Sequence, residues 1–305
     1  MVKASRLQDL QWRIETAGYD LVAALMRVVP IDGASAFGGG VARLIGPFTS
    51  AHRTVLRNLR LAFPEWDEAT RQALAKRQWE NVGRVLFEFF LTDRIMADPG
   101  RVELVDPERV QALKASGRPI MFISGHFANW EIMAATKVIA GIEGVLAYRG
   151  ANNPYIDERM RESRRRYGVN LFAPKGVEGG REVMAALKQG LAVGILTDQK
   201  YYEGPLIPFF GHPARTQHAP VRFAMRFGAV LQPGWVERTN GARFRVYIAD
   251  PIPLPEGGTP ADAEEALRRV NSFIEARARA RPWEYWWVHR RFPDSLYQAL
   301  AKQGH

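Results

Sequence analysis

The sequence predicts an α/β fold, in which a mostly parallel central sheet is flanked by helices and preceded by a helical N-terminal region. Two observations lead to this prediction. After Pro119, short apolar runs alternate with helical segments, as is typical of parallel strands joined by crossover helices. Before it, residues from about 5 to 115 have mostly helical periodicity. With 305 residues and 47% hydrophobic content, the chain can bury a large core.

The chain is predicted to begin with an amphipathic, membrane-associating segment, 1–48. Its apolar part is interrupted by Asp20, Arg27, Pro30 and Asp32. We therefore expect two amphipathic helices that lie in the membrane interface rather than one transmembrane span. The alternative is that these helices pack on the core of the protein. No secretory signal peptide is recognisable at the start of the chain.

The α/β domain is predicted to occupy 49–305, with a helical lead-in that extends to about residue 115. Helices are expected at 53–62, 67–76 and 79–90. In the last of these, apolar residues recur at the spacing of an amphipathic helix.

Strands and helices are expected to alternate through the rest of the chain. The predicted strands are 120–123, 145–148, 169–172, 192–196, 229–232 and 244–248. The predicted helices are about 129–140, 154–167, 180–188 and 260–280. This order predicts a largely parallel sheet with helices on both faces.

One short stretch, GHFANWE at 125–131, combines a histidine and a glutamate at a strand-to-helix junction. His126 follows the predicted strand, and Glu131 falls in the first turn of the next helix. This spacing can bring a carboxylate to the imidazole and leave the other ring nitrogen facing a cleft. We therefore predict that His126 is a general base and that Glu131 holds its tautomer. The alternative is a structural histidine beside a helix start.

Polar side chains follow three of the predicted strands. His126, Arg149 and Asp198 each come just after a strand, where ligands bind in open α/β sheets. Arg149 and Arg164 are candidates for contacts with phosphate or thioester oxygen, because guanidinium donates bidentate hydrogen bonds. Asp198 would orient an arginine or bind a substrate hydroxyl, unless it only caps a strand end. Asn129 would contact the substrate or cap the helix.

Several classes of site are excluded by the composition. The chain has no cysteine, which excludes disulfides, thiolate metal sites and a cysteine nucleophile. It has no G-x-S-x-G, P-loop or H-E-x-x-H motif. We therefore expect neither a cofactor nor a metal ion.

The formal net charge of +10 points to an anionic partner. Positive charge gathers at 159–166, with five Arg and one Glu, and at 268–291, with seven Arg and two Glu. No motif for reading RNA or DNA accompanies these clusters, so a nucleic-acid partner is not expected. An anionic membrane and a phosphorylated substrate remain, and the alternative is that the clusters are solvated helix faces.

These residues together resemble the late, or secondary, acyltransferases of bacterial lipid A biosynthesis, within the lysophospholipid acyltransferase superfamily. The resemblance spans roughly residues 50 to 293. The matching blocks are Arg57-Asn58-Leu59 with Phe63-Pro64, Gly125 to Glu131, Tyr148-Arg149, Asn152-Asn153-Pro154 with Asp157, Arg164, Gly190 through Asp198-Gln199, and Trp286 to Phe292.

The resemblance implies transfer of a fatty acyl chain from acyl carrier protein to a hydroxyl of a phosphorylated glycolipid, the lipid A precursor. It also implies residence on the cytoplasmic face of the inner membrane. An alcohol needs a base as it attacks a thioester, which agrees with the role predicted for His126. The acceptor supplies the nucleophile, so we expect direct transfer in a ternary complex.

Two alternatives remain open from the sequence. One is an acyltransferase that acts on glycerolipid or phosphatidylinositol mannoside and shares the histidine and acidic residue. The other is a basic membrane-binding protein without catalytic activity, against which His126 and Glu131 argue.

Overall fold

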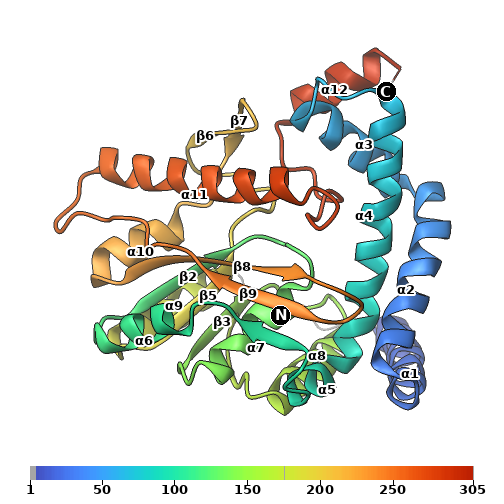
Figure 1. The fold of residues 1–305 in the computed structure, drawn as a ribbon, viewed down its shortest axis with the longest axis horizontal. Coiled ribbons are helices and arrows are strands. Elements are labelled where there is room, and N and C mark those ends of the chain that lie inside the picture. The colour runs from blue at the N-terminus through green and yellow to red at the C-terminus, as the bar shows by residue number, and fades with distance from the viewer. Residues whose placement is uncertain (1–4, 175, 305) are drawn as a thin grey trace.

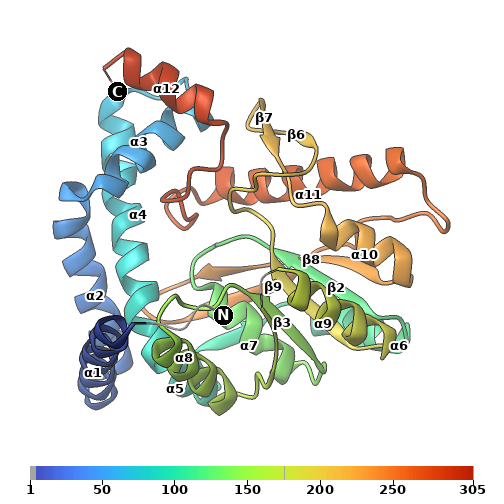
Figure 2. The same ribbon diagram turned by 180° about the vertical axis from the view of Figure 1, so that it is seen from behind.

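The predicted α/β architecture is confirmed by a computed structural model, which describes residues 5–174 and 176–304. A twisted sheet carries helices on both faces (Figure 1), and a column of N-terminal helices stands at one side of it. The view from behind (Figure 2) shows the long helix α11, Pro260–Ala280, lying across the opposite side of the sheet from α7 and α8.

Within the described residues, seven strands form one sheet in the order β1-β9-β8-β2-β5-β3-β4. All neighbours in this sheet are parallel except β8 and β9. A separate antiparallel hairpin consists of β6 and β7. The strands are β1 (Val102–Leu104), β2 (Ile120–Ser124), β3 (Gly144–Tyr148), β4 (Leu171–Pro174), β5 (Ala192–Leu196), β6 (Leu206–Phe209), β7 (His212–Arg215), β8 (Val230–Arg238) and β9 (Phe244–Ile248).

Helices α6, α7 and α8 cover one face of the sheet, and α9, α10 and α11 pack against the other. Two short 3₁₀ helices, η1 (Gly46–Phe48) and η2 (Phe89–Leu91), follow α2 and α4. The other helices are α1 (Arg6–Val28), α2 (Ile31–Ile45), α3 (Ser50–Ala62), α4 (Glu68–Glu88), α5 (Thr92–Ala97), α6 (Pro107–Ala115), α7 (Trp130–Ile139), α8 (Pro154–Arg166), α9 (Val177–Lys188), α10 (Ala219–Phe227) and α12 (Asp294–Lys302).

Three sequence-based expectations differ from the structure. The helices expected at 67–76 and 79–90 are a single helix, α4, because no breaker separates them. The strand expected at 169–172 is displaced toward the C-terminus, as β4. The lead-in to the sheet is not wholly helical, since β1 joins the sheet edge beside β9. Strand β1 has only three residues, which is too short for a recognisable alternation of apolar and polar side chains.

The first 48 residues contain two helices, α1 and α2, as expected. Helix α2 packs closely on α4, where Gly38 and Gly83 leave no room for a Cβ atom between the two backbones. This close contact gives the glycine-rich run of α2 a packing role. Among the helices in residues 5–174 and 176–304, none combines the length and apolar character needed to cross a bilayer.

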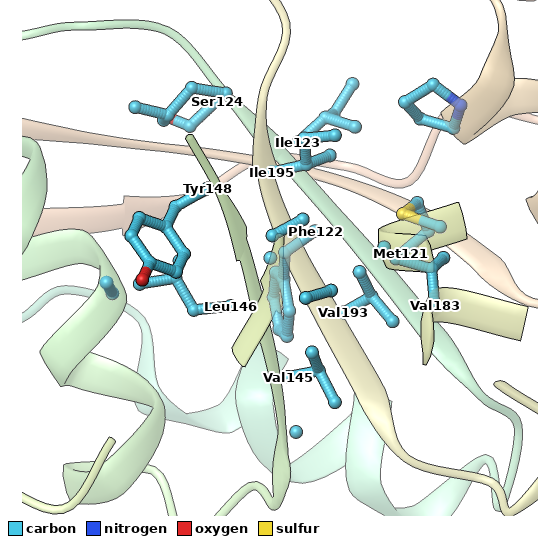
Figure 3. A pocket seen from close by; sticks show the side chains of 18 of the residues that line it. Met121, Phe122, Ile123, Ser124, Val145, Leu146, Tyr148, Val183, Val193 and Ile195 are labelled. Carbon is cyan, nitrogen blue, oxygen red and sulfur yellow. The ribbon is translucent and has the colours of Figure 1, made fainter. Parts of the chain in front are cut away.

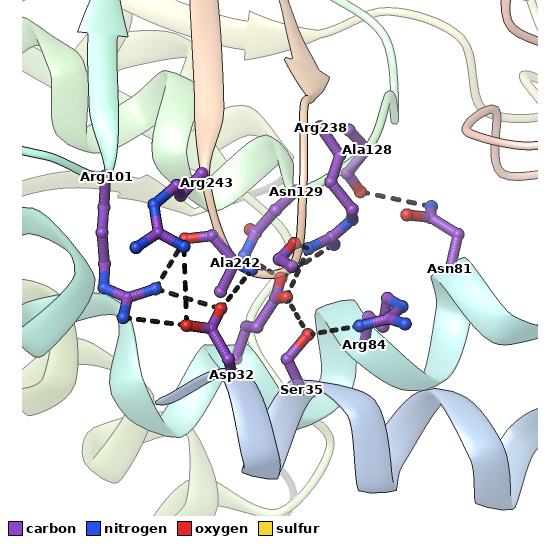
Figure 4. Close-up of polar contacts among 12 residues, drawn as sticks. Asp32, Ser35, Asn81, Arg84, Arg101, Ala128, Asn129, Arg238, Ala242 and Arg243 are labelled. Atoms are coloured by element: carbon purple, nitrogen blue, oxygen red, sulfur yellow. Dashed lines mark hydrogen bonds and ion pairs between the residues drawn. The ribbon is translucent and has the colours of Figure 1, made fainter. Parts of the chain in front are cut away.

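A buried carboxylate joins the N-terminal helices to the sheet. Glu88, at the end of α4, is fully buried and accepts hydrogen bonds from Ser35, Asn129 and both terminal nitrogens of Arg238. These partners converge between α2, the start of α7 and the end of β8 (Figure 4). Because the charge of Glu88 is paired and hydrogen-bonded, its burial is tolerated and it fixes the position of α7.

The C-terminal segment after α11 is held against the loop that follows β2. The backbone N–H of Ala128 donates to the backbone carbonyl oxygen of Glu284. The backbone N–H of Trp286 donates to the backbone carbonyl oxygen of His126. From α3, the side-chain amide of Asn58 donates to the carbonyl oxygens of Trp287 and His289. Segments that are far apart in the chain therefore hold the loop in place.

Candidate active site

His126 lies just beyond the C-terminal end of β2, at the centre of the sheet, and only 7% of its surface is exposed. Strand β5 is next to β2 and is followed by Asp198, and β3, next to β5, is followed by Arg149. The structure thus brings together the ends of the three strands that the sequence singled out. His126 and Asp198 are in contact, whereas Arg149 is exposed at the rim.

The imidazole of His126 is oriented by Asp198 rather than by Glu131, the partner predicted from the sequence. Its Nδ1 lies 2.7 Å from Asp198 Oδ1, and its backbone nitrogen donates to Asp198 Oδ2 at 2.8 Å. Asp198 thus binds His126 rather than an arginine, and its contact with a substrate hydroxyl stays a prediction. Burial opposes ionisation of Asp198, but His126 holds the pKa of this carboxyl below its usual value.

The second ring nitrogen of His126 faces an amide. Gln199 Nε2 lies 3.2 Å from His126 Nε2 and 3.3 Å from His289 Nε2. An amide nitrogen only donates, so both imidazole nitrogens accept from it. Burial, and then the nearby His126, lower the pKa of His289 to about 4, which keeps His289 neutral at neutral pH. His126 thus carries its proton on Nδ1 and its lone pair on Nε2, as a base requires.

Glu131 belongs to a different contact, with α8. Its carboxylate accepts from Arg164 Nη2 at 2.6 Å and Nε at 3.0 Å, and from the hydroxyl of Tyr167 at 2.9 Å. All three side chains are buried. Burial alone would raise the pKa of Glu131, but Arg164 and Tyr167 hold it below its usual value. The bidentate pair fastens the first turn of α7 to the end of α8.

Glu131→Gln is expected to lower the free energy of unfolding by about 3–5 kcal/mol, because it leaves Arg164 charged and buried without a counter-ion. The folded-state pKa of Glu131 is lowered, so the stabilisation is present above a pH of about 4.5 and is lost as the pH falls through the folded-state pKa. Denaturant unfolding at neutral and acidic pH measures both effects. The difference between wild type and variant should shrink on acidification.

The matched control for this prediction is Glu265→Gln, which removes an acid from the exposed pair with Arg269. An exposed pair of this kind contributes at most about 1 kcal/mol. An equally small effect of Glu131→Gln would show that the buried pair does not hold α7 and α8 together.

Asn129 was expected either to contact substrate or to cap the helix, and the structure supports the second role. It is fully buried, its Oδ1 accepts from the backbone nitrogen of Glu131, and its Nδ2 donates to Glu88. Both functional groups of its amide are therefore engaged in the fold. The side chain is not among the residues that line the cavity of the site.

The two arginines predicted to bind substrate occupy different surroundings. Arg149 is exposed at the rim of the site, where its Nη2 donates to Asn152. Arg164 is 5% exposed, and its Nη1 is buried without a hydrogen-bond partner among the described residues. A buried guanidinium nitrogen without a partner is uncommon, and Arg164 is among the residues that line a cavity.

A cavity of about 720 Å³ is lined in part by His126. Figure 3 shows other side chains of its wall, from Met121 to Ser124 and from neighbouring strands. Most of its wall is apolar and comes from β2, β3, β5, α7, α9 and α10. The polar members are gathered near the strand ends and include His126, Glu131, Tyr148, Arg149 and Arg164. A largely apolar cavity with polar groups at one end suits a ligand with a hydrocarbon chain and a reactive polar head.

Three residues that position the site were not identified from the sequence: Gln199, His289 and Glu88. The first two fall inside blocks that carried the family resemblance, and this was the signal that could have identified them. Glu88 gave no such signal. Its role depends on Asn129 and Arg238, which lie far from it in the chain.

Comparison with known proteins identifies one family. The model of the family described as bacterial lipid A biosynthesis acyltransferase matches residues 10–293. The chain is 30% identical over 250 residues to the lipid A biosynthesis lauroyltransferase of Escherichia coli K12, covering 79% of this chain and 78% of that protein. It is 26% identical over 264 residues to the palmitoleoyltransferase of the same organism, with 83% and 82% covered. The corresponding myristoyltransferase is 25% identical over 246 residues, with 78% and 74% covered.

Proposed function

From the premise that the chain belongs to the family of bacterial lipid A biosynthesis acyltransferases, we propose the reaction that it catalyses. It transfers a fatty acyl chain from the thioester of acyl carrier protein to a hydroxyl of a phosphorylated lipid A precursor. His126 acts as general base in a ternary complex of the protein with both substrates.

The observation that carries this proposal is the contact of Asp198 with His126, which lines the largely apolar cavity. Asp198 and Gln199 together leave the lone pair of His126 on Nε2. The acceptor hydroxyl takes the place of the Gln199 amide at Nε2. The thioester carbonyl then lies beside the hydroxyl, with its hydrocarbon chain inside the cavity.

The proposed reaction balances without a nucleophile from the protein. His126 Nε2 removes the hydroxyl proton as the oxygen attacks the thioester carbonyl, and a carbon–oxygen bond forms. The carbon–sulfur bond then breaks, and the departing sulfur takes the proton from the imidazolium. Asp198 stabilises the imidazolium between these steps, as the acid does in a Ser-His-Asp triad.

The two arginines retain proposed contacts with the substrates. Arg149, exposed at the rim, would bind a phosphate of the acceptor, since its guanidinium is accessible and suits phosphate geometry. The free Nη1 of Arg164 would donate to an oxygen of the bound substrates. The net charge of +10 would also speed the encounter with acyl carrier protein, an acidic partner, and make the rate sensitive to salt.

The test is a transfer assay with the purified full-length protein, an acyl thioester of acyl carrier protein, and a tetra-acylated lipid A precursor. Mass spectrometry should find the precursor heavier by one acyl group. A parallel reaction contains a lysophospholipid or phosphatidylinositol mannoside as acceptor. Transfer to one of these and not to the precursor would contradict the proposal, as would the absence of any transfer.

We also propose that α1 and α2 place the protein on the cytoplasmic face of the inner membrane. The side of α1 that faces the protein carries three acids, Asp9, Glu15 and Asp20, which bind residues of α8 or of the cap that precedes it. It also carries Tyr19, which packs on Phe90. The outer side of α1 carries a stripe of exposed apolar residues, and α2 and η1 continue it. The exposed residues are Leu7, Leu10, Ile14, Leu21, Val22, Leu25, Val28, Phe37, Leu44, Ile45 and Phe48.

This arrangement reverses the usual polarity of a surface helix and favours a lipid partner. A helix of a soluble protein turns its apolar side toward the core and its polar side toward water. Here the apolar stripe faces outward, as in helices that lie in a membrane interface. Since α1 lies against α8, whose Arg164 lines the cavity, such docking would bring the bilayer close to the site.

Leu21→Glu together with Leu25→Glu is expected to reduce binding to anionic phospholipid vesicles by about a hundredfold. Each exposed leucine that enters the interface contributes about 1.5 kcal/mol, or about tenfold in partitioning. Vesicle sedimentation of the full-length protein measures the effect. Leu171→Glu with Leu206→Glu is the control, because these leucines are also exposed but lie outside α1 and α2. An equal loss in both double variants would contradict the assignment of the membrane face.

A further inference from the structure

One part of the cavity lies between α7 and the sheet. The residues of β2, β3 and β5 whose side chains point toward α7 form its floor. Phe122, Leu146 and Gly194 at the centre of this floor remain partly exposed. A helix packed on a sheet normally buries such central positions completely, so their exposure marks a space between the sheet and α7, whose Met133 and Ala134 line the same cavity. Phe122 and Leu146 are among the side chains drawn in Figure 3.

The floor contains a gap one residue wide. In the register of the sheet, Phe122 is paired with Gly194 on one side, and Leu146 is paired with Gly194 on the other. The three residues therefore form a row across neighbouring strands, about 4.8 Å apart. Two large side chains flank a position without a side chain, which leaves a trough along β5.

Gly194 has no structural requirement to be glycine. Its φ is not positive, unlike that of the glycines in the turns. A Cβ atom there would meet only Leu146 Cδ1, at 3.9 Å, among the described atoms. Gly144, in β3, is different, because a Cβ atom would collide with the backbone of Ala192. Glycine in a strand interior is unfavourable, so its presence at Gly194 is explained by the space it leaves.

The trough runs from the polar end of the cavity to an apolar end. Near the strand ends are His126 and Tyr148, and farther along the same face the wall includes the apolar residues Leu104, Val110 and Ile248. A ligand with a reactive carbonyl and a straight hydrocarbon chain fits this change from polar to apolar lining, with the carbonyl at His126 and the chain at the apolar end. The width of one residue fits one chain.

We propose that this trough holds the acyl chain of the donor and that Gly194 determines how long a chain is accepted. The inference rests on the proposed function, and it names the substrate feature that the site selects. The names of the similar proteins specify lauroyl, palmitoleoyl and myristoyl groups, and so do not fix the chain length for this protein.

The experiment compares wild type with Gly194→Ala and Gly194→Val, using saturated acyl carrier protein thioesters from octanoyl to palmitoyl. Valine is well tolerated in a strand and would fill the gap between Phe122 and Leu146. Each methylene excluded from an apolar site lowers binding about fourfold. We expect the ratio of kcat/KM for the longest to the shortest accepted donor to fall at least tenfold in Gly194→Val, and less in Gly194→Ala.

The matched control is Ala147→Val, which enlarges a side chain on the opposite face of β3, where Ala147 is paired with Ala173. Activity with the shortest accepted donor should persist in Gly194→Val, which shows that the variant is folded. An unchanged chain-length profile in this variant would overturn the inference. So would an equal shift in Ala147→Val, because the chain would then lie on the other face of the sheet.

A binding measurement separates this inference from the proposed function. Native mass spectrometry with acyl-pantetheine thioesters of the same chains reports occupancy without turnover. If Gly194→Val prefers shorter chains than wild type in this binding measurement, the acyl chain lies in the trough, even if no transfer to the lipid A precursor is found. In that case only the proposed reaction fails. If wild type transfers the acyl chain but binds the same range of chain lengths as Gly194→Val, the proposed reaction stands. Only the inference that the trough holds the acyl chain is then overturned.

Discussion

His126→Ala is expected to fold normally and to lower the rate of acyl transfer by about a hundredfold to ten-thousandfold. This is the usual contribution of a positioned general base, and no other imidazole can replace it. His289, the nearest one, has a pKa that is lowered chiefly by burial, and its Nε2 is bound by the amide of Gln199 rather than by a carboxylate. A base that weak removes a hydroxyl proton poorly.

Steady-state kinetics with acyl carrier protein thioester measures this loss, and thermal unfolding checks the fold. His212→Ala is the control, because His212 is also partly buried but binds the carbonyl of Leu61 and does not line the cavity. Transfer at the wild-type rate in His126→Ala would remove the proposed mechanism. A lower melting temperature with unchanged turnover would make His126 a structural residue.

Asp198→Asn is expected to cause a loss of similar size, for a reason that the geometry makes specific. Asp198 accepts the backbone nitrogen of His126 with one oxygen and the Nδ1 proton with the other. An asparagine must keep its oxygen toward the backbone N–H, so its NH₂ group faces Nδ1. Nδ1 then has to accept, the proton moves to Nε2, and the lone pair needed by the hydroxyl is lost.

The measurements for Asp198→Asn are the transfer rate and the tautomer of His126, read from nitrogen chemical shifts of the labelled imidazole. Asp32→Asn is the matched control. Asp32 also accepts from a backbone nitrogen, that of Ala242, and from a side chain, that of Arg101, but it lies outside the cavity (Figure 4). An active Asp198→Asn whose imidazole keeps its proton on Nδ1 would contradict the role assigned to Asp198.

Local sequence patterns were sufficient for the fold class and for the place of the site. Alternating strands and helices specify parallel strands, and parallel strands end at the same edge of a sheet. For this reason the order of strands and helices along the chain is enough to place His126, Arg149 and Asp198 at one edge. The same reasoning placed two amphipathic helices in the first 48 residues, and both are present as α1 and α2.

Sequence patterns did not determine which charged groups pair. Glu131 is five positions from His126, and proximity along the chain favoured it as the partner. The structure joins Glu131 to Arg164 instead, because a buried guanidinium needs a carboxylate within reach, and gives His126 the more distant Asp198. Asn129 was undecided for the same reason, since its partner Glu88 lies on another helix.

The sequence by itself therefore determined the α/β class, the edge of the sheet that carries the site, and the histidine at its centre, because these depend on periodicity within short segments. Only the tertiary structure decided that Asp198 orients His126, that Glu131 pairs with Arg164, and that Gly194 opens a trough between Phe122 and Leu146. These depend on strand order and register and on the desolvation of charges, which arise only when distant segments pack together.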